Sequence, residues 1–170
     1  MSLKLFNGSI AVAAIAFVLA ASAAHAAVYT SELSFSSAPS TALENFPALV
    51  RISTTAPEGF SYEVCPDASH LWFTDAGGTS LPFEVDTWDV DGTSLVWVSV
   101  PSLSNAATIT MHWADDAANV PNDIPASREV WTRAGYRAVW HFSGSAAESV
   151  ANLVATVIGS PTYNGNNEVR

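Results

Sequence analysis

The chain has 170 residues, of which 49% are hydrophobic and 13% are charged, and this balance excludes a disordered, highly charged protein. Six Lys and Arg against sixteen Asp and Glu give a formal net charge of −10, which argues against nucleic-acid or anionic membrane partners because like charges repel. The single cysteine, Cys65, excludes an internal disulfide and is expected to be a small buried hydrophobe.

Residues 1–26 have the pattern of a secretory signal peptide. Lys4 gives a positive start, residues 10–20 form an unbroken apolar run, and Ala24-His25-Ala26 supplies the small-x-small cleavage pattern. The apolar run is shorter than the about 20 residues that a membrane-spanning helix needs, although an uncleaved anchor is the competing interpretation. The mature chain is therefore expected to be extracytoplasmic (periplasmic, on the cell surface or secreted) and not embedded in a membrane.

Six strand-like segments follow from Tyr29 onward, separated by turns rich in glycine, proline, asparagine and aspartate. They are residues 32–35, 46–53, 70–74, 82–88, 94–100 and 107–113. Ile109, Met111 and Trp113 share one face of the last segment, as in an antiparallel strand with one solvated face. Residues 95–98 are apolar on both faces, as in a central strand covered on both sides. The pattern predicts an all-β fold, an antiparallel, jelly-roll-like β-sandwich preceded by a signal helix.

The composition changes after the last of these strands. Residues 114–128 are polar and interrupted by prolines, so residues 119–135 are predicted to be a linker. Residues 136–142 again have the pattern of an aromatic strand, and residues 149–157 are a candidate for one more. Residues 136–170 are too few to form a sandwich alone. We therefore expect them to be the truncated start of a second β domain, completed by a missing C-terminal part of the same chain.

Five sequence blocks carry a resemblance to a known family, namely residues 46–52, 71–75, 81–88, 95–103 and 109–113. Their order and spacing resemble the bacterial family labelled domain of unknown function 2341, over residues 28–118. Residues 138–142 are similar to the opening strand of a laminin-G/concanavalin-like jelly roll. The resemblance implies an exported β module that often precedes such a jelly roll, and in some proteins a TolQ/ExbB-type proton-channel segment. It brings no catalytic residues.

The segment 82–88 contains the main candidate for ligand binding. Strand alternation places Glu84, Asp86 and Trp88 on one face. A Trp ring stacks on the C–H face of a sugar while carboxylates accept hydrogen bonds from its hydroxyls, so these residues predict a sugar- or peptide-binding face. A solvated strand face with Trp88 packed against a neighbouring strand is the alternative. A catalytic pair fits less well, because the two carboxylates point in parallel and do not flank a substrate bond.

Asp86, Asp89 and Asp91, followed by Gly92, suggest a calcium loop, because hard cations take several oxygen ligands from a tight turn. An aspartate–glycine hairpin turn explains Asp91 and Gly92 equally well. Calcium is the only cofactor for which the sequence gives a reason. The remaining histidines lack the spacing of zinc ligands and are interpreted as ordinary strand residues, namely His70, His112 and His141.

These observations together predict an exported module that is not an enzyme and that binds a glycan or an extracellular or envelope protein. Two alternatives stay open. One is a periplasmic spacer or sensor domain of a TolQ/ExbB-type proton-channel protein, and the other is an accessory domain of a polysaccharide-degrading enzyme.

Overall fold

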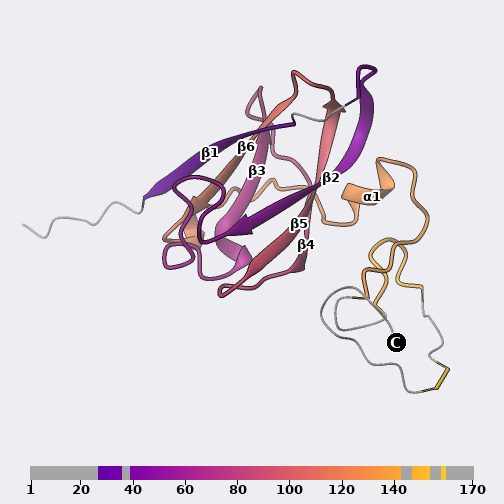
Figure 1. Ribbon diagram of the computed structural model, residues 1–170. Helices are drawn as coiled ribbons and strands as arrows, with labels where there is room; N and C mark the ends of the chain where they lie inside the picture. Colours follow the sequence, from indigo (N-terminus) through magenta and orange to yellow (C-terminus); the bar gives the residue numbers. More distant parts are fainter. Residues whose placement is uncertain (1–26, 36–38, 143–146, 154–157, 160–170) are drawn as a thin grey trace, which may run out of the picture.

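The computed structural model describes residues 27–35, 39–142, 147–153 and 158–159 (Figure 1). The predicted signal peptide, residues 1–26, lies outside the described residues, as does much of the predicted second β domain. Within the described part of the chain, no helix has the length and apolar character that crossing a membrane requires.

The described residues form two antiparallel three-stranded sheets that pack face to face (Figure 1). The strands are β1 (Val28–Ser34), β2 (Leu43–Ser53), β3 (Leu71–Asp75), β4 (Phe83–Thr87), β5 (Thr93–Leu103) and β6 (Thr108–Ala114). One sheet has the order β1-β6-β3 and the other has the order β2-β5-β4. Each predicted strand of the first domain overlaps one of these six, so the predicted antiparallel β-sandwich is confirmed.

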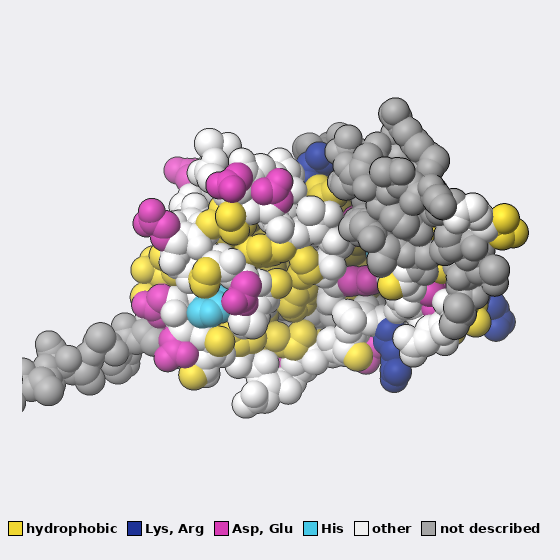
Figure 2. Space-filling view, turned by 90° about the horizontal axis from the view of Figure 1, so that it is seen from below, with side chains coloured by type: hydrophobic (Ala, Val, Ile, Leu, Met, Phe, Trp, Pro, Cys, Tyr) yellow, Lys and Arg dark blue, Asp and Glu magenta, His cyan; other side chains and the backbone are white. Residues whose placement is uncertain are grey.

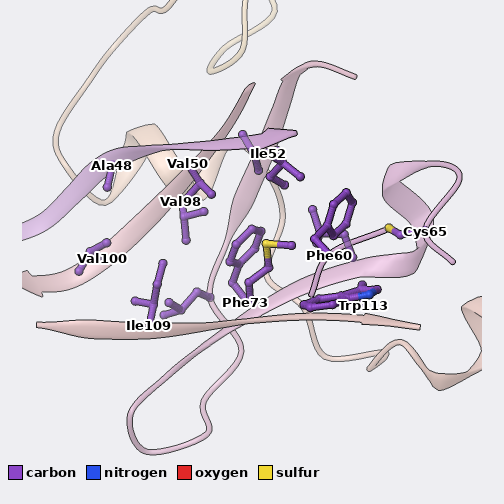
Figure 3. Close-up of a cluster of buried hydrophobic side chains, with 14 of the residues drawn as sticks. Ala48, Val50, Ile52, Phe60, Cys65, Phe73, Val98, Val100, Ile109 and Trp113 are labelled. Carbon is purple, nitrogen blue, oxygen red and sulfur yellow. The ribbon is translucent and has the colours of Figure 1, made fainter. Parts of the chain in front are cut away.

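The core lies between the two sheets and is built by strand alternation (Figure 3). Ile109, Met111 and Trp113 of β6 are at most 1% exposed, as their shared face predicts. Val98 of β5 faces them from the opposite sheet and is fully buried. Cys65 is also fully buried, and burial raises the pKa of its thiol to about 12. The prediction of a small buried hydrophobe at this position is confirmed.

The central strand β5 is covered on both faces, as its apolar sequence predicts. Its outward-facing Trp97 lies beneath α1 (Glu129–Thr132), in which Val130 is fully buried and Trp131 is 4% exposed. The Trp97 and Trp131 ring centroids are 5.2 Å apart. The segment predicted as a linker, residues 119–135, therefore ends in a helix packed on the sandwich, because Val130 and Trp131 form an apolar pair within an otherwise polar stretch.

Residues 136–142 do not form the predicted strand. A single bridge joins Trp140 to Glu148, and the described residues 149–153 contain no strand. The Glu148 carboxylate accepts hydrogen bonds from the backbone N–H groups of Val139 and Val150. In a β-sheet these N–H groups would instead bond to a neighbouring strand. Phe142 has a φ of 58°, a left-handed conformation that interrupts an extended chain. Side-chain capping has replaced strand pairing here.

The charges are unevenly distributed over the described surface. Figure 2 shows acidic side chains spread over the sandwich, whereas the described arginine side chains lie towards the side of the C-terminal segments. Three of the four described arginines lie within ten residues of one another, namely Arg128, Arg133 and Arg137. Arg133 is paired with Glu129 of the same helix at 2.6 Å.

Candidate functional site

Glu84 and Asp86 lie on the outer face of the β2-β5-β4 sheet. Their neighbours Phe83 and Val85 pack against the core, so alternation turns Glu84 outward, where it lies opposite Trp97 of β5. The register of β4 against β5 shifts between Val85 and Thr87, which makes Asp86 the extra residue of a β-bulge. The structure thus brings together two of the three residues predicted to bind a ligand.

The Glu84 carboxylate accepts hydrogen bonds from two groups that follow far along the chain. They are the Trp131 indole N–H, 47 residues away, and the Ser149 hydroxyl, 65 residues away. The His141 ring lies beside both carboxylates, with Nε2 3.6 Å from Glu84 Oε1 and Nδ1 3.9 Å from Asp86 Oδ2. A cluster of polar groups therefore joins β4 to the segment that packs over it.

Two tryptophans complete the surroundings of His141. The Trp97 ring stacks on it with centroids 6.0 Å apart, and the Trp131 ring lies 5.3 Å away at an interplanar angle of 50°. These rings exclude water from one side of the cluster, so the charges of Glu84 and His141 interact in a partly apolar environment. The His141 side chain is only 13% exposed.

The two charged partners shift each other's pKa. Burial opposes ionisation of Glu84, but the adjacent His141 and the hydrogen bonds from Ser149 and Trp131 outweigh it and lower the pKa of Glu84. Burial likewise disfavours the His141 cation, but the adjacent carboxylates of Glu84 and Asp86 raise the pKa of His141. Both shifts favour an ion pair.

A recess of about 270 Å³ opens beside this cluster. Its lining residues come from β4 and from the segment over it, namely Glu84, Val85, Asp86, His141, Phe142, Ala147 and Ser149. Carboxylates, an imidazole, a hydroxyl and one aromatic ring therefore converge on one small space. Such a space suits a small polar ligand with several hydroxyl groups.

A second recess of about 280 Å³ lies between the turn after β3 and the turn between β5 and β6. It contains one carboxylate, that of Asp75, which accepts the backbone N–H groups of Gly77 and Thr79 within its own turn. The rest of its lining consists of backbone and small or aliphatic side chains. It offers fewer converging polar groups than the recess beside Glu84.

Trp88 does not join Glu84 and Asp86. Its ring packs edge-on against Tyr62 and Phe60, with centroids 5.5 and 6.5 Å apart, and its indole N–H donates to the Pro66 carbonyl at 3.1 Å. The bulge at Asp86 adds one residue to the strand, which turns Trp88 to the core side. Trp88 is therefore packed, as in the alternative interpretation, but against the loop after β2 and not against a neighbouring strand, and the face that carries Glu84 and Asp86 is covered and not solvated.

Replacing Trp88 by alanine is expected to act through stability. The partly buried ring contacts two aromatic neighbours, so its loss should lower the free energy of unfolding by about 2–3 kcal/mol. The Trp88→Phe variant retains part of the ring and should lose less than half as much. Urea unfolding followed by circular dichroism measures both. A Trp88→Ala chain as stable as the native chain would contradict this packing.

Asp86, Asp89 and Asp91 are not brought together. The Asp89 carboxylate accepts the Asp91 backbone N–H at 3.1 Å, and a Cβ atom at Gly92 would lie 2.3 Å from its Oδ2, so Asp89 closes a tight turn. Asp86 points to His141 instead. Across the described ranges, no group of three or more His, Cys, Asp or Glu side chains could hold a metal ion.

The sequence interpretation did not identify His141, Trp131 or Ser149 as site residues. The spacing of zinc ligands carries no information about a histidine paired with distant carboxylates. The other two histidines among the described residues fill local roles. His112 Nε2 lies 2.9 Å from Thr74 Oγ1, and His70 Nδ1 lies 2.8 Å from the Ala114 carbonyl.

Three comparisons with known proteins bear on the family and fold of this chain. A scan against protein-family models found no matching family, and searches of curated proteins and of solved structures found no match. The resemblance of residues 28–118 to the domain of unknown function 2341, and of residues 136–170 to a laminin-G/concanavalin-like jelly roll, stays a prediction.

Proposed function

We propose that this chain is an exported, non-catalytic β-sandwich module that binds a glycan in the recess beside Glu84, Asp86 and His141. The observation that carries the proposal is the convergence of carboxylate, imidazole and hydroxyl groups with the Phe142 ring in one recess of about 270 Å³. Carboxylates accept hydrogen bonds from sugar hydroxyls, and an aromatic side chain packs on the apolar C–H surface of a sugar ring.

The contacts within the cluster support binding rather than turnover. A carboxylic general acid needs a raised pKa, whereas the pKa of Glu84 is lowered. The pKa of His141 is raised, but its ring lies between Glu84 and Asp86, which favour an ion pair. The Ser149 hydroxyl donates to Glu84, whose lowered pKa makes it a weak base for activating a nucleophile. These groups are arranged to hold one another and a ligand in place.

The test is a broad glycan array probed with the full chain and with the variant Asp86→Asn. Removing one charge from the recess should weaken binding to the recognised glycans by roughly tenfold or more. The matched control Asp91→Asn removes an exposed carboxylate in the turn after β4 and should bind as the native chain does. A blank array with folded native protein, or equal binding by both variants, would contradict the proposal.

A second candidate is a spacer or sensor domain of a longer envelope protein. It is favoured by the contacts of Glu84 with Trp131 and Ser149, which hold the segment after the sandwich against β4. A rigid connection of this kind would transmit orientation to whatever follows. Reading the gene beyond Arg170 tests it, because transmembrane helices of a proton channel would support this role and an immediate stop codon would end it.

A further inference from the structure

Both ring nitrogens of His141 face carboxylate oxygens. Nε2 lies 3.6 Å from Glu84 Oε1 and Nδ1 lies 3.9 Å from Asp86 Oδ2. A neutral imidazole carries one N–H and one lone pair, so one of these approaches would set a lone pair against a carboxylate. Only the doubly protonated ring matches both neighbours. The geometry therefore fits the cation and penalises the neutral ring.

The ring sits where the chain after the sandwich is fastened to the sheet. We use "latch segment" for residues 129–142 and 147–153. Its contacts with β4 are made by Trp131 and Ser149 on Glu84, and by His141 between Glu84 and Asp86. We propose that His141 makes this attachment pH-sensitive, so that the latch segment is held on β4 when the ring is protonated and loosens when the ring loses its proton.

The charged groups around His141 leave the two β4 carboxylates as its main partners. From β5 the ring meets the neutral Trp97, and from α1 the neutral Trp131. Glu129 of α1 is paired with Arg133, the residue that caps the end of this helix. Glu148, from the other part of the latch segment, accepts four backbone N–H groups of that segment. Arg51 of β2 is exposed.

The sign of the pH dependence follows from the pKa shifts. The pKa of His141 is raised above its ordinary value of 6.5. Its contribution to docking is therefore fully present below about pH 6.5 and is lost as the pH rises through the raised value. The pKa of Glu84 is lowered from 4.5, so its contribution is lost only as the pH falls through that lower value. The latch segment is held most firmly between these limits.

Release would also remove one wall of the recess. Glu84, Val85 and Asp86 line it from the sheet, whereas His141 and Ser149 line it from the latch segment. If the recess binds a glycan, as proposed above, binding should weaken at alkaline pH. This consequence rests on the proposed function, but the latch itself is a property of the chain and needs no ligand.

The experiment is NMR on the full chain without ligand, between about pH 5.5 and pH 9. The His141 ring shifts report its titration, and hydrogen exchange of the Trp131 indole N–H reports docking, since this group donates to Glu84 of β4. After correction for the intrinsic rate, the exchange of this N–H should accelerate by roughly tenfold above the His141 midpoint. Amides of β6 such as Met111 should keep their protection.

Two histidine variants separate the latch from general pH effects. His141→Gln should remove the pH dependence, while His112→Gln, which alters a histidine on the other sheet, should keep it. Asp86→Asn should lower the His141 midpoint. The proposed latch is contradicted if exchange of the Trp131 indole N–H does not follow the native His141 titration, or if His141→Gln keeps the full pH dependence. If the chain binds no glycan but the latch segment still responds to pH, the proposed function is contradicted and the latch is not.

Discussion

Replacing Trp131 by alanine is expected to lower the free energy of unfolding by about 3–5 kcal/mol, the range for a large aromatic side chain lost from a buried site. The Trp131 ring is 4% exposed and covers Trp97 of β5. Its indole N–H is also one of the two donors that Glu84 receives from the latch segment. The variant therefore loses apolar burial and leaves a half-buried carboxylate with one hydrogen bond fewer.

Chemical unfolding of the full chain measures this loss. Tyr136→Ala is the matched control, because Tyr136 contacts the same Trp131 ring at 5.6 Å but is 49% exposed, so its removal should cost about 1 kcal/mol or less. If Trp131→Ala cost no more than Tyr136→Ala, the packing of α1 on the outer face of β5 would be wrong.

Replacing Glu148 by alanine is expected to disorder the backbone of the latch segment while leaving the sandwich folded. One carboxylate accepts the backbone N–H groups of Val139, Val150, Ala151 and Leu153. Without it these donors lose the acceptor that holds them, and each such loss is costly. Amide exchange in residues 139 and 149–153 should accelerate by roughly a hundredfold, since two or more bonds fail together.

The pKa of Glu148 sets the lowest pH at which its carboxylate still holds the latch segment together. Burial opposes the charge of Glu148, but the four backbone donors prevail and lower its pKa from 4.5 to about 2. The contribution of the Glu148 carboxylate to the stability of the latch segment is thus complete above pH 4.5 and disappears as the pH falls through about 2. Glu129→Ala is the control, because this partly exposed carboxylate of α1 pairs with Arg133 and its removal should change exchange little. Equal exchange in both variants would contradict the capping role of Glu148.

The sandwich was predictable because its strands bury one face each. The spacing of Ile109, Met111 and Trp113 fixes which side of β6 meets the core, and such alternation is typical of an antiparallel strand with one buried face. The two-sided apolar sequence of β5 predicted a covering layer, although not which residues supply it. That layer comes from Val130 and Trp131, two apolar residues in a segment whose polar composition indicated a linker.

The candidate site was predictable only in part. Alternation placed Glu84 and Asp86 on the outer face, but it also placed Trp88 there, because a period of two cannot anticipate the bulge at Asp86. His141 and Ser149 reach Glu84 through an irregular segment held by Glu148. Such contacts depend on backbone geometry far along the chain and leave no spacing pattern in the sequence.

The central claim is that residues after the sandwich pack on the outer face of β4 and β5 and complete the site there. NMR contacts between side-chain protons test it most directly in the full chain at about pH 6. We expect nuclear Overhauser effects from the Trp131 indole to the Trp97 and His141 rings, and from the Ser149 side chain to Glu84. Their absence, with the inter-sheet contacts of Phe73 and Val98 intact, would contradict it.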